Sequence, residues 1–111
     1  MKVGPLSCLT VQRAAPPSSS DQWFEFQVRL ARDNYAINTN ARCKTALARQ
    51  LAGLESQSWN HILGQIADGQ GTDALAAAYQ WHLTLFPQGS VPPPSHADEA
   101  AQRLSALRAT I

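Results

Sequence analysis

A helix predicted to begin near residue 56 carries, on one side, side chains suited to sequence-specific hydrogen bonding. The helical period places them together on the outward side, away from the apolar residues of the segment. Side-chain amides bind the edge of adenine in the DNA major groove with two hydrogen bonds, and a histidine adds a donor or an acceptor. The candidate base-contacting residues are Gln57, Asn60, His61 and Gln65.

Three cations lie upstream of this segment. Arg42, Lys44 and Arg49 form the one locally basic stretch of the sequence, and we expect them to contact phosphates and so to set the register of a bound duplex. The whole chain has a formal net charge of +1, which provides no large field for capturing nucleic acid or an acidic membrane. A DNA complex would therefore depend on a few local contacts.

The elements that must position these residues lie between Thr45 and Gly69. Two short amphipathic helices are predicted there, and Gly53 joins them because glycine tolerates the positive φ of a tight connection. The first helix would turn Ala48 and Leu51 toward the core. The second helix is expected to turn four apolar residues inward, namely Trp59, Ile62, Leu63 and Ile66.

The run LARQLAGLESQSWNHIL, within residues 47–64, resembles the helix-turn-helix of phage-repressor-type transcription regulators. It has the Leu-Ala pair, the glycine turn, the Ser-Gln-Ser run and an apolar pair three residues apart. The resemblance implies that the second helix enters the major groove and that a homodimer reads two half-sites. The first hypothesis is therefore a small, non-enzymatic DNA-binding regulator with a helix-turn-helix-like element at about residues 45–68.

An ordinary helical hairpin explains the same stretch and leads to a second hypothesis. Three tryptophans and five other aromatic residues exceed what one small core must hold, so some of them would anchor a protein partner. The chain would then be a small helical protein-interaction module: an adaptor, an inhibitor or an accessory subunit of a larger assembly, including one that contains nucleic acid. The candidate interface residues are Trp23, Trp81, Leu104 and Leu107.

Other kinds of site are not indicated. The three histidines lack the spacing and the partners of a metal site, and His82, on the apolar side of its helix, is expected to be a hydrogen-bonded core or interface residue. No nucleophile has a base and an orienting acid nearby in the sequence. Cys8 and Cys43 are too few and too far apart to suggest a disulfide framework, so two unpaired thiols are expected. We expect no enzyme activity, no metal and no cofactor.

The composition is that of a small helical protein. Of the 111 residues, 44% are hydrophobic and 15% are charged, and straight-chain residues outnumber the β-branched residues that favour strands. No apolar run of about 20 residues could span a membrane, and the first residues do not read as a signal peptide. We therefore expect a cytoplasmic protein with a DNA or protein partner and no membrane contact.

A single, mainly α domain of four to five helices with an extended N-terminal arm is predicted over residues 1–111. Its expected parts are an arm and Pro/Ser linker (1–20), a helical core (21–86), a Pro-rich linker (87–95) and a C-terminal helix (96–111).

Residues 22–37 are the ambiguous part of this prediction. Phe24, Phe26 and Val28 alternate with polar residues as in a strand, whereas Glu25 and Arg29 are spaced as on one side of a helix. The helix accounts for more of the segment and is favoured. The alternative is an α+β fold with an N-terminal β-hairpin.

Overall fold

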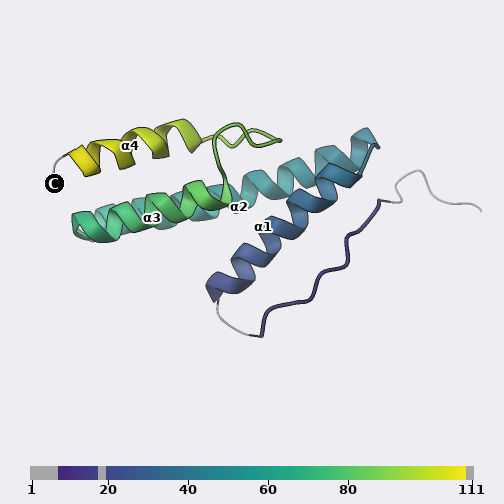
Figure 1. Ribbon diagram of the computed structural model, residues 1–111, viewed down its shortest axis with the longest axis horizontal. Coiled ribbons are helices and arrows are strands. Elements are labelled where there is room, and N and C mark those ends of the chain that lie inside the picture. The colour runs from purple at the N-terminus through teal and green to yellow at the C-terminus, as the bar shows by residue number, and fades with distance from the viewer. Residues whose placement is uncertain (1–7, 18–19, 110–111) are drawn as a thin grey trace, which may run out of the picture. The chain divides into compact units, whose positions relative to one another are not determined.

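The computed structural model describes residues 8–17 and 20–109, and all the regular structure within them is helical (Figure 1). The mainly α fold class is confirmed, and the alternative β-hairpin is wrong for the described residues, which contain no strand. Residues 22–37 lie within the first helix. The helices are α1 (Ser20–Ile37), α2 (Ala41–Ala67), α3 (Thr72–Leu85) and α4 (Ala97–Ala109).

Two compact units make up the chain, Met1–Leu51 and Ala52–Ile111, and their boundary lies inside α2. The first unit contains α1, the first part of α2 and an N-terminal arm, residues 8–17, which has neither helix nor strand. The second unit contains the rest of α2 together with α3 and α4. One domain over residues 1–111 stays a prediction.

Asparagines separate the two helices of the first unit. α1 ends at Ile37, and Oδ1 of Asn40 accepts hydrogen bonds from the backbone N–H groups of Arg42 (2.8 Å) and Cys43 (3.3 Å). This is the usual way in which an asparagine caps the start of a helix. Val28 lies on the inward side of α1 and is fully buried. The alternating apolar residues that resembled a strand therefore belong to a helix.

A disulfide bond joins Cys8 of the arm to Cys43 of α2, with the two Cα atoms 5.7 Å apart. The prediction of two unpaired thiols is therefore wrong. It failed because the two cysteines are 35 residues apart in sequence and only the fold brings them together. The cytoplasmic location, which was expected on other grounds, stays a prediction.

α2 runs without interruption from Ala41 to Ala67, so Gly53 lies in the middle of a helix. The glycines with positive φ in the described chain are Gly69 and Gly89. The predicted turn at Gly53, and with it the helix-turn-helix-like element at about 45–68, is therefore wrong as local structure. The helix continues because its buried side keeps a helical spacing across the glycine, through Leu51, Leu54, Ser58 and Ile62.

α2 ends where glycine allows the chain to reverse. Gly69 has a φ of +74°, its N–H donates to the carbonyl of Ile66, and the N–H of Gln70 donates to the carbonyl of Gln65, each over 3.0 Å. This pair of bonds is the Schellman motif, which satisfies the last carbonyls of a helix. α3 then begins at Thr72.

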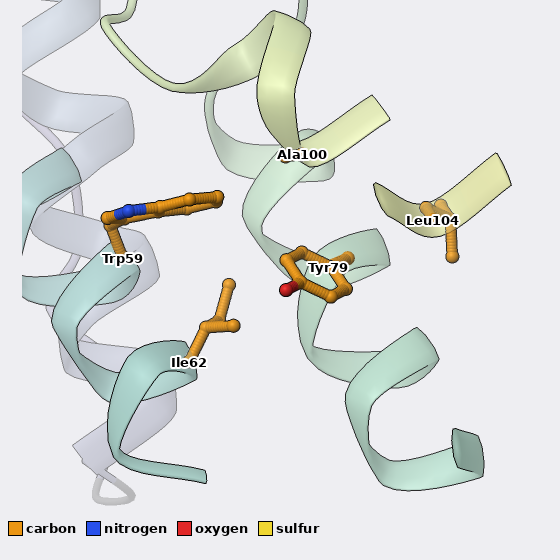
Figure 2. Packing of buried hydrophobic residues seen from close by; sticks show 5 residues of the cluster. All are labelled: Trp59, Ile62, Tyr79, Ala100 and Leu104. Atoms are coloured by element: carbon orange, nitrogen blue, oxygen red, sulfur yellow. The ribbon is translucent and has the colours of Figure 1, made fainter. Parts of the chain in front are cut away.

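The core of the second unit is formed by all three of its helices. α3 packs along α4 (Figure 1), and an apolar cluster joins them to α2 (Figure 2). Leu104 is 4% exposed within this cluster, so its assignment to a protein interface is wrong. The buried members are Trp59, Ile62, Tyr79, Ala100 and Leu104.

Two residues expected in this core lie outside it. Leu63 and Ile66 are 41% and 42% exposed, so the prediction that both face inward is wrong. Leu63 follows Ile62 directly and is therefore rotated away from the buried side of α2. Ile66 lies on the same side as Trp59 and Ile62 but one turn further along, next to the end of the helix at Ala67, where its side chain is only partly covered. None of the helices in the described parts of the chain has both the length and the apolar character that a membrane span requires.

Candidate functional site

A buried carboxylate organises the second unit. Glu55 lies on the inward side of α2, and its side chain is 2% exposed. An ionised group at such depth is unstable unless donors surround it. Those donors come from His82 on α3 and from His96, the residue immediately before α4.

Both oxygens of the Glu55 carboxylate accept hydrogen bonds. The backbone N–H of His96 donates to Oε2 over 2.7 Å, and its ring Nδ1 donates to Oε1 over 3.2 Å. Nε2 of His82 donates to Oε2 over a longer distance of 3.4 Å. The hydroxyl of Ser58 lies 2.8 Å from Nδ1 of His82 and donates to it, because Nε2 carries the proton of the neutral ring. We call Glu55, Ser58, His82 and His96 the Glu55 cluster.

Trp59 covers one side of the Glu55 cluster. Its indole ring stacks on the imidazole of His96 and meets His82 edge-on, with centroids 5.5 Å apart in the second pair. The guanidinium of Arg103 lies 5.2 Å from the centroid of the same indole, within the range of a cation–π contact. Arg103 also donates to the hydroxyl of Tyr79 over 3.3 Å. Trp59 thus shields one side of the cluster from water, while the His96 side chain remains 31% exposed.

Burial controls the protonation of His82. Desolvation lowers the pKa of the His82 imidazole below its ordinary value because the charged form loses its hydration. The charge of Glu55 and its hydrogen bond oppose this shift, and the charge of His96 adds to it. On α4, the hydrogen bond to Tyr79 raises the pKa of Arg103.

The order Ser58, His82, Glu55 matches the residue types of a hydrolytic triad, but the environment differs from that of an active site. Ser58 is 3% exposed and His82 is fully buried, so a substrate carbonyl cannot reach the hydroxyl. The arrangement instead ties α3 and the start of α4 to α2. In the described parts of the chain, no group of three or more His, Cys, Asp or Glu side chains could hold a metal ion.

The predicted base-contacting residues lie on the outward side of α2. Gln57, Asn60 and His61 are exposed, Gln65 is partly buried, and His61 and Gln65 are hydrogen-bonded to each other over 3.2 Å. We call the exposed surface of α2 from Gly53 to Ala67 the α2 outer face. Its exposed residues, none of which is charged, are Gly53, Ser56, Gln57, Asn60, His61, Leu63, Gly64, Ile66 and Ala67.

The predicted phosphate-contacting residues differ in their surroundings. Arg42 and Arg49 are exposed and line a shallow hollow in the first unit together with Thr45. Lys44 is held by Tyr35: its Nζ donates to the Tyr35 carbonyl over 2.7 Å and lies 4.1 Å from the centroid of the Tyr35 ring. The structure therefore leaves two of the three cations available to a phosphate.

The predicted interface residues are also divided. Trp23 is 42% exposed and meets Phe26 edge-on, with ring centroids 5.5 Å apart. Trp81 is half-buried, and Leu107 is a half-buried residue packed against the apolar cluster of the second unit. Trp23 is thus the most accessible of the four candidates.

Sequence reasoning anticipated one member of the Glu55 cluster and missed the others. His82 was expected to be a hydrogen-bonded core or interface histidine, and the structure shows it hydrogen-bonded in the core. Glu55 was missed, although an acidic residue between Leu54 and Ile62 on the apolar side of a helix is a readable signal. His96 lies 41 residues further along the chain, so its pairing required the fold.

No protein-family model, no curated protein and no solved structure matches the chain. Its function has to be inferred from its own residues.

Proposed function

We propose that the chain is a small, non-enzymatic helical protein that acts by binding another protein through the α2 outer face. The observation that carries the proposal is the chemistry of this face. Its exposed residues include no charged side chain, and two of them are the apolar residues Leu63 and Ile66, which are 41% and 42% exposed. The water-facing side of a helix usually carries charges.

Several features of the α2 outer face support a protein partner. Depletion of charge together with exposed apolar side chains is typical of the centre of a protein interface. Leu63 and Ile66 are three residues apart, so they lie next to each other on the helix surface. Gly53 and Gly64 have no neighbouring atoms within 4 Å of an added Cβ. That open space leaves room for another backbone to approach.

Site-specific photo-crosslinking in the native host tests the proposal. A photoreactive residue at Leu63 or Ile66 should form a covalent adduct with a protein, and nuclease treatment should leave the adduct unchanged. The matched control is the same residue at Gln102, an exposed position on α4, which should give no adduct. Equal adducts at all three positions, or none at Leu63 and Ile66, would refute the proposal.

The disulfide between Cys8 and Cys43 supports action in an oxidising compartment, because glutathione and thioredoxin keep cytosolic thiols reduced. The redox state in living cells tests this part of the proposal. Acid quenching followed by a mass-tagging maleimide should leave the chain unmodified unless it is first reduced. Two tags without prior reduction would contradict it.

DNA binding is the second candidate, and one observation favours it. Arg42 and Arg49 are exposed beside the same hollow of the first unit, where two guanidinium groups could receive a phosphate. Binding of a fluorescent duplex should then weaken steeply with salt, and Arg49→Ala should reduce the salt slope by about 0.9. Absence of binding at low salt would eliminate this candidate.

A further inference from the structure

Two asparagines four residues apart hold the backbone of the N-terminal arm: Asn34, in the last turn of α1, and Asn38, the residue after the end of that helix. Oδ1 of Asn38 accepts the N–H of Leu9 over 2.8 Å, and Nδ2 of Asn38 donates to the carbonyl of Leu9 over 3.0 Å. Oδ1 of Asn34 accepts the N–H of Val11 over 2.6 Å. The two amides therefore bind the arm at alternate residues, as a neighbouring strand would.

The arm is attached by directed bonds more than by burial. Leu9 is 59% exposed, and Cys8 is exposed as well. Besides the asparagine contacts, the disulfide to Cys43 and an ion pair between Arg13 and Asp33 connect the arm to the helices of the first unit. The asparagine contacts are made to backbone groups of Leu9 and Val11, so they recognise an extended backbone and not particular side chains.

We propose that this asparagine site also accepts the arm of a second copy of the chain, giving an arm-exchanged dimer. Cys8 of each copy then forms its disulfide with Cys43 of the partner subunit. Every contact of the arm is preserved in the exchange because each donor and acceptor is replaced by its counterpart. Pro16 and Pro17 join the arm to α1, and adjacent prolines favour an extended connection over one that folds back.

The exchanged disulfides can form from oxidised monomers or from reduced chains, and the reaction balances in each case. Starting from oxidised monomers, a small thiolate opens one intrachain S–S bond and is released when the last interchain bond closes. Two intrachain bonds break and two interchain bonds form, so no net oxidant is needed. Starting from reduced chains, one oxidised glutathione per bond accepts two electrons and the two thiol protons and leaves as two molecules of glutathione.

Two full-length variants, Cys8→Ser and Cys43→Ser, test the exchange because neither can form the native disulfide within itself. In an equimolar mixture with oxidised glutathione, Cys8 of one variant should bond Cys43 of the other. Nonreducing electrophoresis should show a species of twice the 12.0 kDa monomer mass, which a thiol reductant removes. Peptide mapping should identify the Cys8–Cys43 linkage, and failure of this linkage to form would overturn the proposal.

The placement of Asn38→Ala distinguishes a seated arm from a random collision of thiols. In the Cys8→Ser variant the change removes the site that receives the arm, and the initial rate of heterodimer formation should fall about fivefold or more. The Cys43→Ser variant donates the arm that carries Cys8, and the site that receives this arm lies on the other variant. Asn38→Ala in the Cys43→Ser variant therefore leaves the receiving site unchanged, and the initial rate of heterodimer formation should not fall. Equal effects in both variants, or no effect in either, would overturn the proposal.

A second pair of exposed residues guards against misfolding of the Asn38 variant. Arg13→Asp in the Cys43→Ser variant and Asp33→Arg in the Cys8→Ser variant should each slow heterodimer formation, because like charges then face each other. Combining the two reversals should restore the rate. If neither charge reversal changes the rate of heterodimer formation, the arm is not seated in the partner's site.

Discussion

The imidazole ring of His96 lies flat against the indole ring of Trp59, with ring centroids 4.6 Å apart and ring planes 11° from parallel. The same imidazole donates a hydrogen bond to the buried carboxylate of Glu55. The His96 side chain thus contacts both an apolar residue, Trp59, and a buried carboxylate, Glu55.

His96→Ala should lower the free energy of unfolding by about 1–3 kcal/mol, because Glu55 loses a donor and Trp59 loses its stacked neighbour. Urea denaturation followed by tryptophan fluorescence measures this change. The matched control is His61→Ala on the exposed side of α2, for which a change within about 0.5 kcal/mol is expected. Equal losses in the two variants would contradict the role assigned to His96.

Glu55→Gln should destabilise the protein by about 3 kcal/mol. The substituted amide keeps the shape of the side chain but offers one acceptor oxygen where the carboxylate offers two, and its NH₂ group would face a donor. Glu99→Gln, at an exposed ion pair with Arg103 on α4, should cost about 0.5 kcal/mol or less. Similar melting temperatures for the two variants would show that the buried carboxylate is not the stabilising partner.

Acidification should destabilise the protein through His82. Its folded-state pKa lies below the ordinary value of 6.5, so below that pH the unfolded chain binds a proton that the folded chain resists. The free energy of unfolding should therefore fall as the pH decreases through 6.5 and toward the folded-state pKa, by at most about 1.4 kcal/mol per pH unit.

Denaturation curves of the wild type and of His82→Gln over this pH range isolate the contribution of His82. The variant keeps a side chain that can hydrogen-bond Glu55 but cannot titrate, so its stability should depend less on pH. Parallel pH profiles for the two proteins would show that His82 does not cause the acid sensitivity.

Gly53→Ala should stabilise the protein by about 0.5–1 kcal/mol, because glycine in a helix interior is less favourable than alanine. An added Cβ at this position meets no atom within 4 Å. Gly69→Ala should have the opposite effect, about 1–2 kcal/mol, because Gly69 has a φ of +74°. Thermal denaturation of both variants measures the contrast. Destabilisation by Gly53→Ala would contradict a helical conformation at Gly53 and would favour the turn that the resemblance implied.

The sequence predicted the helices better than their connections. Residues 22–37 were correctly assigned to a helix because polar residues at i,i+4 spacing outweighed a short apolar alternation. The predicted boundaries at residues 86 and 96 lie within one residue of the end of α3 at Leu85 and of the start of α4 at Ala97. Pro87 marks the first of them because proline does not continue a helix. Gly53 misled the prediction because the cost of one glycine is small compared with the burial of Leu51, Leu54 and Ile62 around it.

The contacts that a single sequence could not provide are those between distant residues. Cys8 reaches Cys43 over 35 residues, and Glu55 reaches His96 over 41. Local spacing carries no information about such pairs, because either side chain has an ordinary alternative, a free thiol or a solvated charge. The exposed position of Gln57 and Asn60, by contrast, followed from periodicity alone.

Glu55 accepts hydrogen bonds from a side chain on α3 and from His96, the residue immediately before α4. If either helix left α2, a negative charge would remain in an apolar surrounding with part of its solvation missing. Partial fraying is thereby penalised more than complete opening. Slowly exchanging amide protons in α3 and α4 should therefore share one opening free energy and behave as a single cooperative unit in native-state hydrogen exchange.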